Sequence, residues 1–346
     1  MIDEFIFFHP EPIPELSTID PLRYHLGYHA WIVQAYQRLQ ERQFPCSLSQ
    51  EFPDEGIVIG FRTTFPHDAR PSGRRFLVCV QADYPPFAYS NVDIVQNPTQ
   101  VRTARGKLRY HIPHFPQIGL IPRAEEHGDR FCRVGYFGRL YGVNRSPVLG
   151  SFEFRRWLEN HGFELVVGHE PRQWHDYSNI DAIIAIRSFA SPHKHKPATK
   201  LVNAWLGNVP AILGPESAYR AIRCSEFDYI EVDSIEATQN ALMMLRKNPD
   251  LRREMVKHGK LRAKAYTFES ITQAWIDLLA GPIANEGERW FSDSALQKSY
   301  FLKRKLGGRL IDYAECLVQQ RGAIGAIRHC LRRPFELATS STRRTT

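Results

Sequence analysis

The sequence predicts an α/β protein with two Rossmann-like domains that face each other across a cleft, followed by a basic helical C-terminal extension. Short apolar runs alternate with helical patterns, which is typical of parallel sheets with helices on both faces. Residues 110–131 contain several prolines and glycines and show no periodicity, so they predict a linker between two such series. The length of 346 residues also suits two domains of about 150 residues each.

The first series predicts an N-terminal domain over residues 1–128. Apolar residues recur at helical spacing between residues 24 and 43, which predicts an amphipathic helix. The strand candidates are uninterrupted apolar runs, as expected of strands that are covered on both faces, and they lie at residues 4–9, 55–61, 74–83 and 92–97.

The second series predicts a further domain over residues 129–282. Its strand candidates lie at residues 132–138, 163–168, 180–187, 209–214 and 229–232. Helical patterns lie between or after them, at residues 151–162, 198–206, 216–224, 235–267 and 268–281. This alternation predicts a second doubly wound parallel sheet.

The remaining residues, 283–346, mix apolar side chains with many Arg and Lys residues and predict a basic helical tail. Two interpretations of this tail stay open. It is either a basic amphipathic helix on an anionic membrane surface, or a helix pair that packs back on the first domain. No stretch approaches the ~20 apolar residues of a membrane span, so we expect a cytoplasmic protein, with a peripheral place on the inner face of the membrane as an option.

The formal net charge of +8 favours an anionic partner, such as a nucleotide, a phosphate, acidic lipid or nucleic acid. The six cysteines are scattered without a CxxC pair, which predicts reduced thiols and argues against a zinc site. No Asp-x-Asp pair occurs, so we expect neither a metal ion nor a cofactor.

The clearest binding motif is the basic stretch in front of the predicted helix 198–206. Pro197 suits the first turn of a helix, and Gly207 suits its end. A helix N-terminus binds anions through its unpaired N–H groups and its dipole. Lys196, Lys200 and, from the end of the preceding strand, Arg187 are expected to converge there, and this predicts a diphosphate site. Asn203 is expected on the same helical face as Lys200.

The stretch "KPATKLVNAWLGNVPAILGPESAY", from Lys196 to Tyr219, resembles the donor-binding half of nucleotide-sugar glycosyltransferases of the two-domain GT-B type. The resemblance covers roughly residues 132–279, and the N-terminal half is similar to small uncharacterised bacterial members. In inverting fucosyltransferases the lysine that matches Lys200 contacts the donor diphosphate. The resemblance implies an acceptor-side first domain, a donor-binding second domain and transfer of a sugar from a nucleotide-diphosphate donor to a hydroxyl.

The sequence departs from these families at their carboxylates. His195 and Asn203 stand where retaining members carry two glutamates, and Thr199 stands where the fucosyltransferase pattern has its glutamate. Glu216 is a candidate substitute, although a carboxylate at the start of a helix is also an ordinary cap. These departures leave the donor sugar and the stereochemical outcome open.

Further site candidates come from both domains. Gly138 and Arg139 follow a predicted strand and form a second phosphate-loop candidate, because glycine permits close backbone approach and arginine can clamp a phosphate. The candidates for the catalytic base that activates the acceptor hydroxyl are Asp83, His25, His29 and His114. Each also has a plainer interpretation. Asp83 would be a turn residue, His25 and His29 would be partly buried helix residues, and His114 would line the wall of the cleft.

Three functions compete. The leading one is a metal-independent glycosyltransferase that uses a nucleotide sugar and a glycan or lipid-linked acceptor in cell-surface polysaccharide or glycolipid biosynthesis. The second is a catalytically inactive nucleotide-sugar-binding partner protein. The third is a nucleic-acid-binding protein, which we do not expect, because the basic residues match no known recognition module.

Overall fold

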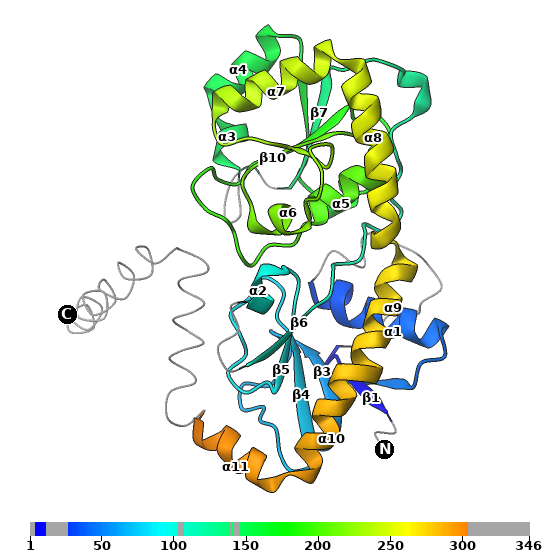
Figure 1. Cartoon of the computed structure of the whole chain (residues 1–346), viewed down its shortest axis with the longest axis vertical. Coiled ribbons are helices and arrows are strands. Elements are labelled where there is room, and N and C mark those ends of the chain that lie inside the picture. The colour runs from blue at the N-terminus through cyan, green and yellow to red at the C-terminus, as the bar shows by residue number, and fades with distance from the viewer. Residues whose placement is uncertain (1–3, 12–26, 103–106, 139, 141–145, 304–346) are drawn as a thin grey trace, which may run out of the picture.

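The computed structural model describes residues 4–11, 27–102, 107–138, 140 and 146–303 (Figure 1). Within these residues the strands form two separate sheets, and the strand pairs of both sheets are parallel. The strand order is β2-β1-β3-β4-β5-β6 in the first sheet and β11-β10-β9-β7-β8 in the second. The predicted α/β fold with two Rossmann-like domains is therefore confirmed.

The first domain contains all four strands that the sequence predicts. Its strands are β1 (Phe5–Phe8), β2 (Cys46–Ser49), β3 (Gly56–Phe61), β4 (Arg75–Val80), β5 (Val92–Val95) and β6 (Leu108–His111). Its helices are η1 (His29–Val33), α1 (Gln34–Glu41) and α2 (Thr99–Arg102). The edge strands β2 and β6 were not predicted, because their sequences CSLS and LRYH lack the apolar run of a central strand.

The second domain follows a linker that includes the short η2 (Glu125–His127). Its strands, all five of them predicted, are β7 (Arg133–Phe137), β8 (Glu164–Gly168), β9 (Ala182–Ala185), β10 (Ala211–Leu213) and β11 (Ile230–Glu231). Its helices are α3 (Pro147–Gly150), α4 (Phe152–Asn160), η3 (Pro171–Gln173), α5 (Thr199–Leu206), α6 (Ser217–Ile222), α7 (Ile235–Lys247), α8 (Pro249–Ala263) and η4 (Lys264–Tyr266).

After η4 the chain returns to the first domain. The helix α9 (Phe268–Leu278) packs against the first sheet, and Trp275 is fully buried there, with its ring 6.1 Å from that of Phe7. Residues 268–282, which the sequence predicts in the second domain, therefore pack into the core of the first domain. The apolar face Ile271, Trp275 and Leu278 explains this, because it completes the cover of the sheet.

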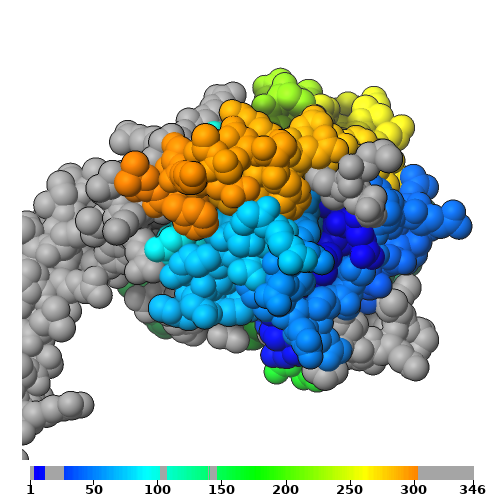
Figure 2. All heavy atoms as spheres, turned by 90° about the horizontal axis from the view of Figure 1, so that it is seen from below, coloured from blue at the N-terminus to red at the C-terminus, as the bar shows by residue number. Residues whose placement is uncertain are grey.

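The described part of the tail also packs on the first domain. It consists of η5 (Leu279–Ile283), α10 (Ala284–Ser292) and α11 (Ser294–Lys303), and in Figure 2 the orange atoms of this segment lie directly against the blue and cyan atoms of the first domain. Trp290 is buried and donates a hydrogen bond of 2.7 Å to the carbonyl of Ser72, and Tyr300 donates one of 3.1 Å to the carbonyl of Ser90. Up to residue 303 the tail thus follows the packed-back alternative. Residues 304–346 lie outside the described part of the chain. Among the described residues, no helix is long and apolar enough to span a membrane.

Candidate active site between the domains

The carboxyl ends of the two sheets meet at the interface between the domains. Gln96 and Asn97 follow β5 directly and are both buried. Gln96 donates a hydrogen bond of 2.9 Å to the carbonyl of His195, and Asn97 donates to the carbonyl of Lys196 at 3.1 Å and to the Ser217 hydroxyl at 2.9 Å. In open α/β sheets ligands bind at this edge, so the interface is the place to look for the site.

An ion pair between Asp83 and Lys196 links the domains at the same edge. The Lys196 ammonium lies 2.5 Å from the Asp83 carboxylate, and Gln96 donates to the other carboxylate oxygen at 2.6 Å. Lys196 is buried, whereas the side chain of Asp83 is 44% exposed. The sequence indicates Asp83 as a candidate base and Lys196 as a candidate phosphate ligand. The structure brings the two into direct contact.

Lys200 lies at the start of α5 and points to the end of β7. Its ammonium donates a hydrogen bond to the carbonyl of Phe137 and lies 4.9 Å from the ring centre of Tyr136. Burial lowers the pKa of Lys200 to about 7, and the positive charges of Arg187 and Lys196 act in the same direction. A bound anion would stabilise the protonated form of Lys200, as the negative charge of Glu216 already does.

Gly138 lies next to the ammonium of Lys200. It has a φ of +153°, and a Cβ atom at this position would lie 3.2 Å from the Lys200 ammonium. The next residue, Arg139, lies outside the described residues, as does His25. The backbone of Gly138, directly after β7, thus lies close to the ammonium of Lys200.

Arg187, which follows β9 closely, forms a buried ion pair with Glu216. Glu216 is fully buried and precedes α6, but its side chain does not cap that helix. Burial raises the pKa of Glu216, and Arg187 opposes this rise. Its Oε1 atom has no hydrogen-bond partner among the described residues. The capping interpretation therefore does not describe the structure, and Glu216 instead holds Arg187 in place.

Two other predicted residues of α5 have different surroundings. Thr199 begins the helix, and its buried hydroxyl oxygen has no partner within the described part of the chain. Asn203 is buried one turn further on and accepts a hydrogen bond of 3.3 Å from the backbone N–H of Gln117. Thr199 thus lies at the N-terminal end of α5, whereas Asn203 contacts the linker.

His114 lines a small pocket between the domains, together with Gln96 and His111 from the first domain and Thr199 and Val202 from the second. Its Nδ1–H donates a hydrogen bond of 2.6 Å to the carbonyl of Phe115. Burial lowers the pKa of His114, so its imidazole is neutral at pH 7. In this tautomer Nε2 carries a lone pair, which is the state that a general base requires.

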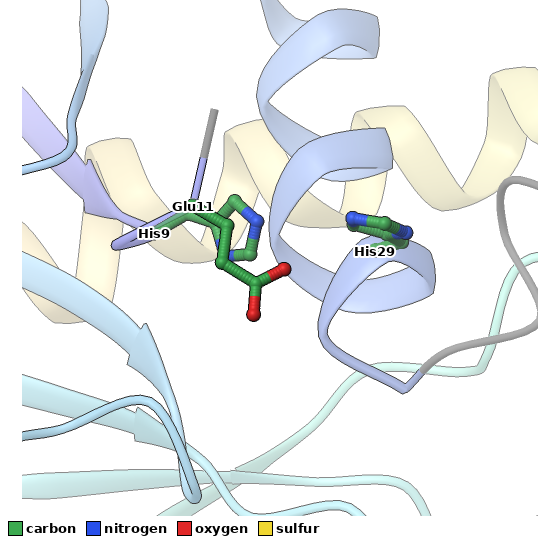
Figure 3. Close-up of side chains that lie close together, drawn as sticks. All are labelled: His9, Glu11 and His29. Atoms are coloured by element: carbon green, nitrogen blue, oxygen red, sulfur yellow. The ribbon is translucent and has the colours of Figure 1, made fainter. Parts of the chain in front are cut away.

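His29 lies beside His9 and Glu11 of the first domain (Figure 3). His9, Gln96 and Asn97 are not among the site residues that the sequence predicts. Each of them directly follows an apolar strand, and that position was the available signal. Polar residues directly after a buried strand often belong to a binding site in such sheets, but they are also common in ordinary turns.

No protein-family model and no curated protein matches the sequence. Among solved structures, the fold is similar to HepE from Anabaena in complex with UDP, with a TM-score of 0.49, 10% identity, and coverage of 80% of this chain and 99% of HepE. Sucrose-phosphate synthase from Thermosynechococcus elongatus gives a TM-score of 0.48 and 13% identity, covering 79% and 81% of the two chains. AviGT4, a glycosyltransferase involved in avilamycin A biosynthesis, gives a TM-score of 0.43 and 12% identity, covering 80% of this chain and 98% of AviGT4. At these identities the similarity concerns the fold alone.

Proposed function

We propose that the protein is a glycosyltransferase that moves a sugar from a nucleotide-diphosphate donor to a hydroxyl acceptor. The observation that carries the proposal is a group of three positively charged residues, Arg187, Lys196 and Lys200, around the start of α5. We call it the cation cluster. It lies at the start of α5, where Thr199 lines a small pocket together with His114, a neutral imidazole of the first domain. This arrangement suits a donor diphosphate on one side and an acceptor on the other.

The cation cluster would bind the diphosphate in the donor and stabilise it as the leaving group. Preorganised positive charge in a site with little water lowers the energy of the charge that develops as the bond to the sugar breaks. The backbone N–H groups of Thr199 and Lys200 precede the first hydrogen bonds within α5 and add donors. The diphosphate would replace Asp83 as the partner of Lys196. We therefore propose that the chain itself, without a metal ion, neutralises the diphosphate.

We propose His114 as the general base. The acceptor oxygen would attack the anomeric carbon while the bond from that carbon to the diphosphate oxygen breaks, and the hydroxyl proton would move to Nε2 of His114. Such a single displacement inverts the anomeric centre. Asp83 is the less suitable base, because its two carboxylate oxygens already accept hydrogen bonds from Lys196 and Gln96.

For the acceptor we propose a glycan or lipid-linked hydroxyl in cell-surface polysaccharide or glycolipid biosynthesis, with the protein in the cytoplasm or on the inner face of the membrane. The Arg- and Lys-rich sequence at the end of the chain supports this, because clustered positive charge attracts anionic lipid. Sedimentation with vesicles that contain anionic lipid tests this part separately. Unchanged binding after truncation at residue 303 would contradict it.

The first experiment on the donor is a thermal-shift screen of the full chain against UDP, GDP, CMP, dTDP and ADP. A ligand that binds only the native state raises the melting temperature, so one of the diphosphates is expected to do so selectively. Its sugar conjugates are then tested for transfer. Lys200→Ala is expected to abolish the shift, and an unchanged shift in that variant would remove the cation cluster from the proposal.

A catalytically inactive nucleotide-sugar-binding partner protein is the second candidate. The observation that favours it is Asn203, which takes the place of a family carboxylate and contacts the linker. Nucleotide binding without turnover of any donor sugar would favour this candidate over the enzyme.

A further inference from the structure

A second group of functional side chains lies in the first domain, outside the cation cluster. His9 and Glu11 come from the loop after β1, and His29 begins η1 (Figure 3). One ligand atom of each, a ring nitrogen or a carboxylate oxygen, lies within 4.8 Å of the other two. Parallel strands end at a common edge, so this group shares the carboxyl edge of the first sheet with Asp83 and Gln96.

His9 is the residue that requires an explanation. It is 0% exposed, and neither ring nitrogen has a hydrogen-bond partner among the described residues. Buried polar atoms are nearly always paired, because an unpaired one loses its hydrogen bonds to water without compensation. The His9 ring stacks on Tyr28 at 5.1 Å and meets the His29 ring edge-on at 5.5 Å. A ring nitrogen of His9 is thus held within reach of Glu11 and His29.

Tyr28 connects the group further. Its hydroxyl donates a hydrogen bond of 3.3 Å to the Glu11 carboxylate, and its ring stacks on the ring of His9. Groups that orient metal ligands in this way are a regular part of metal sites. The Glu11 side chain is exposed, so the group is accessible from solvent.

We propose that His9, Glu11 and His29 bind a divalent transition-metal ion, with zinc as the first candidate. Two imidazoles and one carboxylate are a ligand set that zinc uses in catalytic sites, where three protein ligands leave the fourth position to water or to a substrate oxygen. The ion would supply a partner for the buried His9 ring. All three ligands belong to the first domain and none is part of the cation cluster, so this inference does not depend on the proposed function.

A second group with similar chemistry provides a control. One ligand atom each of Cys224, Asp228 and His258 also lies within 4.8 Å of the others. Both carboxylate oxygens of Asp228 are already occupied, however. One accepts from His258 and from Arg262, each at 3.1 Å, and the other accepts from the backbone N–H groups of Cys224 and Ser225. Arg262 takes the place of a cation here, so this group is not expected to bind zinc tightly.

The test is zinc binding by the full chain after removal of metal with a chelator and removal of the chelator. Zinc chloride is titrated in competition with a fluorescent zinc indicator, and one zinc ion per chain is expected. Glu11→Gln keeps the size of an exposed side chain, so it should leave the fold intact. Loss of a group that merely orients a metal ligand weakens binding by about 10–100-fold, so loss of a ligand is expected to cost at least about 100-fold. His29→Gln serves as the second variant.

Cys224→Ser is the matched control and is expected to bind zinc as the wild-type chain does. Cobalt replaces zinc as an independent readout, because its visible spectrum reports the ligand set, and Glu11→Gln is expected to change that spectrum. Zinc binding that survives in Glu11→Gln and His29→Gln, or that disappears in Cys224→Ser, would overturn the proposal. So would the absence of zinc binding in the wild-type chain.

Discussion

Burial gives Lys200 a pKa of about 7, so the charge of this residue changes within the pH range of an ordinary assay. A diphosphate binds the protonated form, and binding in turn keeps the proton on. Affinity is therefore expected to be constant below pH 7 and to fall by up to about tenfold for each pH unit above it. Isothermal titration of the nucleotide found in the screen, from pH 6 to pH 9, measures this slope.

Lys200→Met separates the titration of Lys200 from that of the nucleotide itself. The variant keeps most of the apolar stem but removes the charge, so affinity at pH 6.5 is expected to fall by about 10–100-fold, as for a lost hydrogen bond to a charged group. The slope above pH 7 should also flatten. A slope identical to that of the wild-type chain would show that another group titrates.

Asp83 competes with a diphosphate for Lys196, if the proposal for the donor site is correct. Asp83→Asn removes a carboxylate that is 44% exposed, and a partly exposed ion pair contributes little free energy. We therefore expect the nucleotide to bind more tightly, by up to about fivefold, in the same titration. Asp68→Asn, a substitution at another exposed aspartate of the first domain, is the control. Weaker binding in Asp83→Asn would mean that Asp83 supports the ligand instead.

His114 is tested by turnover. A general base contributes about 10²–10⁴-fold to the rate, so His114→Gln is expected to lower kcat within that range while the dissociation constant of the nucleotide stays unchanged. The wild-type activity should also fall as the pH drops through the lowered pKa of His114. A fall in nucleotide affinity without a change in kcat would assign His114 to donor binding.

At the scale of elements, the sequence predicts well the helix at which we propose the donor site. The prediction of residues 198–206 and the observed α5 (Thr199–Leu206) differ by one residue, because Pro197 and Gly207 are strong local signals. The strands β2 and β6 escape prediction, since hydrogen bonds to neighbouring strands define them more than their own composition does. The contacts of Gln96 and Asn97 could not be predicted from local sequence patterns either. They depend on residues about 100 positions away.

Asn97 shows how strongly β5 is tied to the second domain. Its side chain donates to Lys196 and Ser217 and accepts from the backbone N–H of Thr99, all in a buried position. Asn97→Ala leaves these partners unpaired, so we expect a loss of about 2–4 kcal/mol in the free energy of unfolding, measured with urea. Asn160→Ala, an exposed substitution at the end of α4, is the control, and equal effects of the two would argue against a bonded interface.

For the whole molecule, the decisive feature is that the chain, within its described residues, crosses between the domains twice. Local patterns define the helix α9 correctly, but they do not say on which sheet it packs, since an apolar face fits either core. The sequence therefore assigns residues 268–282 to the wrong sheet. The described contacts of Trp275 with Phe7 and Trp31 make α9 a part of the first domain.

Trp275→Ala tests this assignment, because a cavity in the first core should loosen the first domain and leave the second intact. Removing a buried tryptophan costs about 3–5 kcal/mol, and the loss is expected as faster amide hydrogen exchange in β1, β3 and α1. Exchange in β7, β9 and β10 should stay close to that of the wild-type chain. Leu261→Ala, at a residue that is 59% exposed in α8, controls for the substitution itself. If exchange rises first in the second sheet, the stability of α9 depends on the second domain. That result would support the predicted end of the second domain at residue 282. If it rises in the first sheet alone, the segment around Thr267 is where one domain ends and the other resumes.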